Sequence, residues 1–187
     1  MRTTNPATSS ALDGPRVERS VGVDAGGLVA RGAIGGLAAG TGFILANMWF
    51  AAVHGGPAVA PFIAISTVFH ASDAPTMAPA AVPGEVVTGL VVHVALSIGF
   101  GMAFALLLGL SPKLRQPAML VGAALLYGLG LYVLNFQILG RTAFPFFTNP
   151  MGPNQAFEAI IHPLIFGGLL IPFFLGAGHA TLGRDAR

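Results

Sequence analysis

A few polar and ionisable residues lie inside long apolar stretches of this sequence, where such groups are unexpected. Glu158 and His162 are four residues apart, a spacing that puts both on one face of a helix. Together with His93 they make a ligand set suited to zinc or copper, and the two histidines alone could hold a haem iron axially. Glu158 and His162 could instead pass protons. A fourth reading is a polar network that fixes helix register and holds a few waters.

The apolar stretches that carry these residues predict a membrane protein. Of the 187 residues, 54% are hydrophobic and only 9% are charged, whereas a soluble domain has about 25% charged residues. Each stretch is long enough to cross the bilayer as a helix, which takes about 20 residues. We therefore predict an all-α, polytopic fold, a four-helix transmembrane bundle that spans the membrane at about residues 33–53, 86–110, 118–139 and 156–175.

The polar residues fall at one depth if the four helices alternate in direction. All would then lie within about 10 Å of the outer boundary, at 1.5 Å per residue. Polar side chains at membrane depth are costly unless they face the bundle interior, a partner or water. We therefore predict an outward-facing polar pocket, whose residues are Asn47, His93, Asn135, Glu158 and His162.

Basic residues set the orientation, because Lys and Arg favour the cytoplasmic side. They gather before the first span, between the second and third, and after the fourth, while the other two connections share one arginine. Both termini are therefore predicted to be cytoplasmic. The basic residues, Arg141 being that single exception, are Arg2, Arg16, Arg19, Arg31, Lys113, Arg115, Arg141, Arg184 and Arg187.

The segments outside the spans divide into two tails and one long connection. Residues 1–30 are polar, and we expect a disordered cytoplasmic tail ahead of a transmembrane domain at 31–180; residues 181–187 form a second cytoplasmic tail. The outer connection 54–85 is rich in Ala and Pro. Its apolar centre, 61–69, is too short to span, which favours an interfacial or re-entrant helix.

Glycines spaced four apart predict close helix packing, because a missing side chain lets another backbone approach. One such face lies on the first span, and a comparable stripe of small residues, which includes Ser97 and Ala105, lies on the second. They serve either packing within the bundle or a homodimer seam, and the sequence leaves both open. The glycines are Gly32, Gly36, Gly40, Gly89 and Gly101.

Several function classes lack support. There is no cysteine, which excludes thiolate metal sites and cysteine nucleophiles. No P-loop, G-x-G-x-x-G or G-x-S-x-G motif and no basic recognition helix is present. We therefore expect neither an enzyme nor a nucleic-acid-binding protein.

Three segments carry a recognisable pattern: G-x-x-x-H-x-x-x-S within 87–101, an N-F pair within 127–136, and H-x-x-x-F-G within 158–168. In these segments the chain resembles a functionally uncharacterised family of small bacterial integral membrane proteins with four transmembrane helices. The resemblance implies the architecture, a bacterial cytoplasmic (inner) membrane location, and the importance of His93, Asn135 and His162. It implies no activity.

Three functional hypotheses follow from the sequence. The leading one is a non-enzymatic accessory or small-solute and proton-handling component of the membrane. The second is a redox subunit that binds a metal ion or haem through His93 and His162. The third is a structural subunit whose glycine faces dock a homodimer or a larger membrane complex.

Overall fold

The computed structural model describes residues 25–70 and 74–175. These residues are mostly helical and include no strand. Four helices are long and apolar enough to cross a membrane, at Ala25–Val53, Pro83–Leu110, Pro117–Thr142 and Gln155–Phe174. The predicted all-α, four-helix membrane fold is confirmed.

Two of the four spans are regular α-helices and two change their winding midway. The first and second spans are α1 (Ala25–Val53) and α3 (Pro83–Leu110). The third consists of α4 (Pro117–Tyr132), the π-helical segment η4 (Val133–Leu139) and α5 (Gly140–Thr142). The fourth consists of α6 (Gln155–Ile161), the π-helical segment η6 (His162–Gly167) and α7 (Gly168–Phe174).

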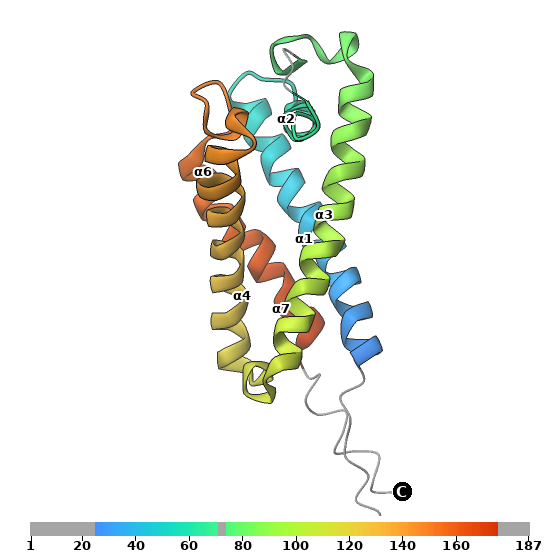
Figure 1. Cartoon of the computed structure of the whole chain (residues 1–187), viewed down its shortest axis with the longest axis vertical. Coiled ribbons are helices and arrows are strands. Elements are labelled where there is room, and N and C mark those ends of the chain that lie inside the picture. The colour runs from blue at the N-terminus through green and yellow to red at the C-terminus, as the bar shows by residue number, and fades with distance from the viewer. Residues whose placement is uncertain (1–24, 71–73, 176–187) are drawn as a thin grey trace, which may run out of the picture.

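Neighbouring spans run in opposite directions, so the bundle has two different ends (Figure 1). One end, the tail end, holds Ala25, Leu110, Pro117 and Phe174; the other, the loop end, holds Val53, Pro83, Thr142 and Gln155. The first span packs chiefly on α3, and α4 packs chiefly on η6. Contacts of α1 with η6 and α7 join these two pairs of helices.

The tail half of the bundle has an apolar core. Phe104 packs edge-on against Phe174 with ring centroids 5.4 Å apart, and Tyr127 packs against Phe104 at 5.1 Å. Around them the buried residues are Leu28, Ala39, Ala105, Leu108, Leu120, Ala124, Leu131, Phe166 and Leu170. This core fixes the four helices at one end and leaves the polar side chains nearer the loop end.

The first span begins at Ala25, ahead of the predicted start at residue 33. Leu28 is only 8% exposed and belongs to the apolar core, and its side chain lies against Gly109. The first helix therefore packs on α3 already within residues 25–32, ahead of the predicted span. Residues 1–24 and 181–187 of the predicted tails lie outside the described residues.

The connection between α1 and α3 contains the predicted short helix as α2 (Ala60–Ser66). It is followed by the 3₁₀ turns η1 (Ala74–Thr76) and η2 (Pro79–Ala81). Phe62 and Ile63 are buried, and the Phe62 carbonyl lies directly against Gly89 of α3. A short helix thus covers the bundle beside α3 near the loop end.

Two further 3₁₀ turns complete the connections. The turn η3 (Pro112–Arg115) joins α3 to α4, and η5 (Pro145–Thr148) lies between α5 and α6. On the bundle surface every span exposes large apolar side chains, among them Ile34, Val91, Leu126 and Leu164. Such a surface suits lipid and not water, so the chain is a multi-pass membrane protein.

Candidate functional site

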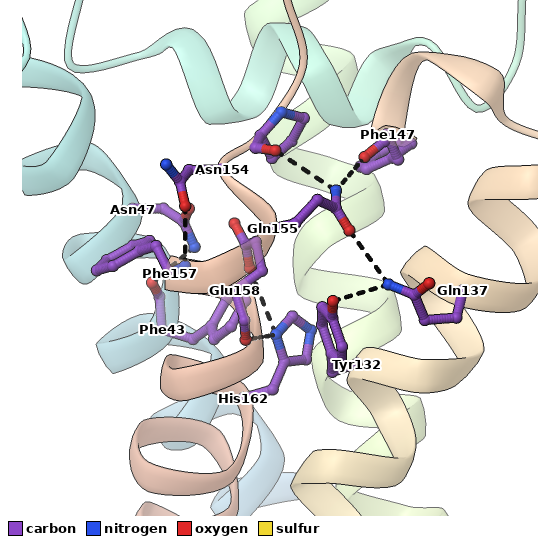
Figure 2. A network of polar contacts seen from close by, with 11 residues as sticks. Phe43, Asn47, Tyr132, Gln137, Phe147, Asn154, Gln155, Phe157, Glu158 and His162 are labelled. Carbon is purple, nitrogen blue, oxygen red and sulfur yellow. Dashed lines mark hydrogen bonds and ion pairs between the residues drawn. The ribbon is translucent and has the colours of Figure 1, made fainter. Parts of the chain in front are cut away.

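Glu158 and His162 form the most buried polar pair of the bundle, with exposed fractions of 3% and 4%. The Asn154 side chain caps α6 by accepting the Phe157 N–H at 3.0 Å, and this start fixes Glu158 in the first turn. His162 Nδ1 lies 2.8 Å from the Glu158 backbone carbonyl and 3.4 Å from its Oε2. Figure 2 shows both contacts.

The Glu158 carboxyl group is incompletely satisfied. Its Oε2 is buried and has no hydrogen-bond donor among the described residues, although the Asn47 side chain lies beside the carboxyl group. Asn47 also donates to the Phe43 carbonyl at 3.4 Å. A bare carboxylate at this depth is costly unless it is protonated or paired. A proton on Glu158, or one shared between Glu158 and His162, would offset this cost.

Aromatic rings surround the His162 imidazole. Phe43 meets it edge-on with ring centroids 4.5 Å apart, Phe136 at 5.6 Å and Tyr132 at 6.0 Å. These rings exclude bulk water from the pair and leave Tyr132 as the nearest polar ring. The low polarity of the surroundings strengthens every electrostatic interaction inside them.

The backbone beneath the pair is π-helical, and Pro163 follows His162 within this segment. A proline has no N–H and cannot continue the i→i−4 hydrogen-bond pattern. The helix widens through η6, and at its end the Gly168 N–H reaches back five residues to the Pro163 carbonyl. Gly128 of α4 packs directly on the His162 carbonyl and Pro163. Pro163 therefore lies in a π-helical segment that packs on a glycine. Such segments are frequent at functional sites.

His93 lies in different surroundings, on the interface of α1 with α3. Its Nε2 is 2.9 Å from the Gly40 carbonyl and 3.4 Å from Ser97 Oγ. Ser97 Oγ in turn donates to the His93 carbonyl at 2.6 Å. The Phe43 ring packs against both imidazoles, stacked on His93 at 6.4 Å and edge-on to His162. His93 and His162 therefore belong to two separate polar clusters with an aromatic ring between them.

The prediction of a metal or haem site on His93 and His162 gains no support from this geometry. Among the residues that the structure describes, no group of three His, Asp or Glu side chains is arranged to hold a metal ion. His93 Nε2 is already engaged by the Gly40 carbonyl, and the Phe43 ring packs against both imidazoles. The sequence predicted both histidines at one depth, but a common depth alone does not make two side chains face one another.

Comparison with known protein families, with curated proteins and with solved structures gave no match.

Asn135 does not join the pair. It is half-buried in η4 and is not among the hydrogen-bonded residues of Figure 2. Gln137, two residues further on, takes the expected place: its Nε2 donates to Tyr132 Oη at 2.7 Å and to Gln155 Oε1 at 3.3 Å. Arg141 donates to Gln137 Oε1 from Nε at 3.1 Å and from Nη2 at 2.8 Å.

Gln155 and Arg141 are parts of the site that the sequence-based prediction missed. Gln155 Nε2 donates to the Phe147 carbonyl at 2.5 Å, which ties the start of α6 to the loop before it. Neither residue lies deep in an apolar stretch, so neither stands out by hydropathy. Their positions could have indicated them, because both are polar residues at the ends of spans. The interiors of these spans carry Glu158 and Gln137.

The predicted glycine faces meet within one chain. A Cβ atom added at Gly36 would collide with the Ser97 carbonyl and the Gly101 backbone, and one added at Gly32 would meet Gly101 and Ala105. Gly40 lies against the Ser97 side chain. These faces are covered by α1 and α3 themselves, which is the internal-packing reading of the pattern.

A separate pocket of about 270 Å³ lies at the loop end. It is lined by Thr67, His70, Ala143, Phe144, Pro145, Phe146 and Asn149. His70 Nε2 is 3.3 Å from the Glu85 carboxylate. None of the predicted pocket residues lines it, so the buried polar pair and this open pocket are different features.

Proposed function

We propose that this chain is a non-enzymatic component of the bacterial cytoplasmic membrane that takes up and releases a proton at Glu158 and His162. One observation carries the proposal. A glutamate that is 3% exposed inside a membrane-spanning helix has an unpartnered carboxyl oxygen 3.4 Å from an imidazole nitrogen.

A purely structural role explains His93 better than it explains Glu158. The His93 imidazole and Ser97 hydroxyl satisfy one another and the Gly40 carbonyl, as expected of a network that holds two helices together. Glu158 is left one donor short, and buried ion pairs seldom repay their desolvation in stability. A site that must exchange its proton needs such a group, whereas a site that only fixes helix register does not.

The orientation follows from charge. Arg31, Lys113 and Arg115 lie toward the tail end, while Arg141 is the basic side chain at the loop end among the described residues. By the preference of Lys and Arg for the cytoplasm, the tail end and both termini are cytoplasmic. The Glu158–His162 pair then lies nearer the outer face.

The size of the chain favours an accessory role or an oligomer. Secondary transporters are usually built from paired repeats with a substrate site at the bilayer midplane. Four spans with a small, enclosed pair near one face fit a protein that handles protons for a larger assembly, or one that works as several copies.

Proton flux into vesicles tests the proposal. We expect the purified protein, reconstituted with a pH-sensitive dye inside the vesicles, to dissipate an imposed pH gradient faster than empty vesicles do. Glu158→Gln should remove this flux, because the amide has no exchangeable acid proton. Glu85→Gln is the matched control, since it removes the carboxyl group at the loop end, and it should leave the flux unchanged. A parent protein no faster than empty vesicles would overturn the proposal.

A further inference from the structure

Three polar side chains lead from the loop end to the buried pair, and the hydrogen bonds between these three run in one direction. The order is Arg141, Gln137, Tyr132 and His162, drawn from Gln137 inward in Figure 2. A guanidinium only donates, so its contact with Gln137 Oε1 fixes which end of that amide is oxygen. The Gln137 nitrogen must then point at Tyr132.

This assignment determines the direction of the Tyr132 hydroxyl. Its oxygen accepts from Gln137 Nε2 at 2.7 Å, so its own hydrogen points to a different acceptor. No hydrogen-bond acceptor for it is recorded among the described residues, and the nearest ring with a free lone pair is His162. The two ring centroids are 6.0 Å apart and the ring planes meet at 64°, so the two side chains are direct neighbours.

The tautomer of His162 is fixed from the opposite side. Its Nδ1 lies 2.8 Å from the Glu158 backbone carbonyl, which can only accept, so Nδ1 carries the hydrogen. Nε2 of the neutral ring therefore offers a lone pair, and Figure 2 shows this nitrogen on the side of Tyr132. A hydroxyl with a free hydrogen and an imidazole with a free lone pair thus belong to two neighbouring rings.

We propose that Tyr132 is the relay residue through which the Glu158–His162 pair exchanges its proton with the loop side. This inference rests on the proposed function and adds the route and its direction. In the inward step, the Tyr132 hydroxyl gives its hydrogen to His162 Nε2 as it takes one from loop-side water, and His162 Nδ1–H passes its hydrogen to the Glu158 carboxylate. One proton enters, the carboxylate becomes a carboxylic acid, and the imidazole ends neutral with its hydrogen on Nε2. The reverse transfer restores the first tautomer.

The groups around the relay are compatible with this route. From α1 the pair meets Asn47 and Phe43, which do not titrate; from α3 it is separated from His93 by the Phe43 ring; from η4 it meets Phe136. Arg141 is the nearest charged side chain on the route and is held by Gln137 at the loop end. No second ionisable group stands between Tyr132 and His162 among the described residues.

Time-resolved infrared spectroscopy of the reconstituted protein tests the route. The Glu158 carboxyl band is identified by its loss in Glu158→Gln, and its rise is followed after the pH is lowered on the loop side only. We expect Tyr132→Phe to keep the full amplitude of the band and to slow its rise on the order of tenfold to a hundredfold. The other tyrosine supplies the matched control: Tyr127 donates to the Phe100 carbonyl at 2.7 Å, and Tyr127→Phe should leave the rate unchanged.

The outcomes separate the route from the proposed function. A Glu158 band that rises equally fast in Tyr132→Phe and in the parent, or that rises as fast when the pH is lowered on the tail side, would overturn the route while leaving the proton site intact. A parent protein without any Glu158 band that responds to pH would overturn the proton site itself.

Discussion

The two halves of this bundle treat a buried histidine in opposite ways. In the half made by α1 and α3, regular helices meet through glycines, and His93 finds partners in Gly40 and Ser97. In the half made by α4 and η6, the helices widen into π-helical segments, and His162 sits beside a carboxyl oxygen that lacks a donor. A polar group at membrane depth can therefore serve to hold helices together or to keep a proton available, and the completeness of its hydrogen bonds distinguishes the two.

Backbone approach explains why the first half is satisfied. Gly36 and Gly101 let α1 and α3 come so close that a main-chain carbonyl of one helix reaches a side chain of the other. Between membrane helices the driving force is packing and hydrogen bonding, because lipid is as apolar as the helix surfaces. Each contact in this half contributes to that association.

The largest effect should come from breaking the glycine contact. Gly36→Leu places a branched side chain where even a Cβ atom would collide with the Ser97 carbonyl and the Gly101 backbone. We expect the free energy of unfolding to fall by about 3 kcal/mol or more, the upper range for overpacking, as measured by denaturant unfolding in mild detergent.

The matched control for this substitution lies on the opposite face of α3. Gly99 is exposed, and nothing lies within 4 Å of a Cβ atom added to it, so Gly99→Leu should unfold like the parent. If the two leucine variants had equal free energies of unfolding, the close backbone contact between α1 and α3 would not be what stabilises this half of the bundle.

A smaller effect should separate the two polar clusters. His93→Ala removes the donor to Gly40 and leaves Ser97 with one partner fewer, so we expect a loss of about 1–3 kcal/mol in the free energy of unfolding. Glu158→Gln should change it by less than about 1 kcal/mol, because the amide keeps the shape while removing a carboxyl group that gains little from burial. Unfolding curves of the two variants in one detergent give the comparison directly.

A larger loss of stability in Glu158→Gln than in His93→Ala would contradict the roles assigned to the two polar clusters. If Glu158→Gln cost more stability than His93→Ala, the Glu158–His162 pair would be the structural one. The proton site would then have to be sought elsewhere in the bundle.

The sequence predicted the fold well because hydropathy sums over whole spans. Four stretches of about 20 apolar residues leave no other arrangement in lipid. The start of α1 was missed by the same reasoning, since residues 25–32 are held helical by the contact of Leu28 with α3. Such a contact cannot be read from the segment alone.

The site was predicted only in part, and η4 shows why. With 3.6 residues per turn, Asn135 should share a face with Gly128 and Tyr132. The π-helical winding that begins at Val133 shifts every later side chain, so Gln137, five residues after Tyr132, takes that face instead. In the fourth span the π-helical winding begins only at His162, so the predicted contact between Glu158 and His162 is kept. His93 was predicted to share a pocket with this pair, whereas the Phe43 ring packs against both imidazoles and His93 bonds to Gly40.

The smallest effect should come from Pro163→Ala, which asks what holds the π-helical winding in the second half. The new N–H can form a backbone hydrogen bond worth about 1 kcal/mol, but losing the proline frees the unfolded chain by about 0.4–1 kcal/mol. These contributions nearly cancel, so stability should change by less than about 0.5 kcal/mol. The winding itself should persist, because Gly167 packs against the Ala124 carbonyl and a return to α-helix would rotate Gly167 away by about 100°.

Hydrogen-bond couplings measured by NMR decide between packing and proline as the cause. In the parent the Gly168 N–H is shared between the carbonyls of Ile165 and Pro163, three and five residues back, and we expect the coupling to residue 163 to remain in Pro163→Ala. A coupling to Leu164, four residues back, would mean that the proline alone imposes the winding. In that case the α-helical variant should also lose the contact of the His162 carbonyl with Gly128. The difference in helix winding between the two halves of the bundle would then come from one residue, Pro163, and not from their packing.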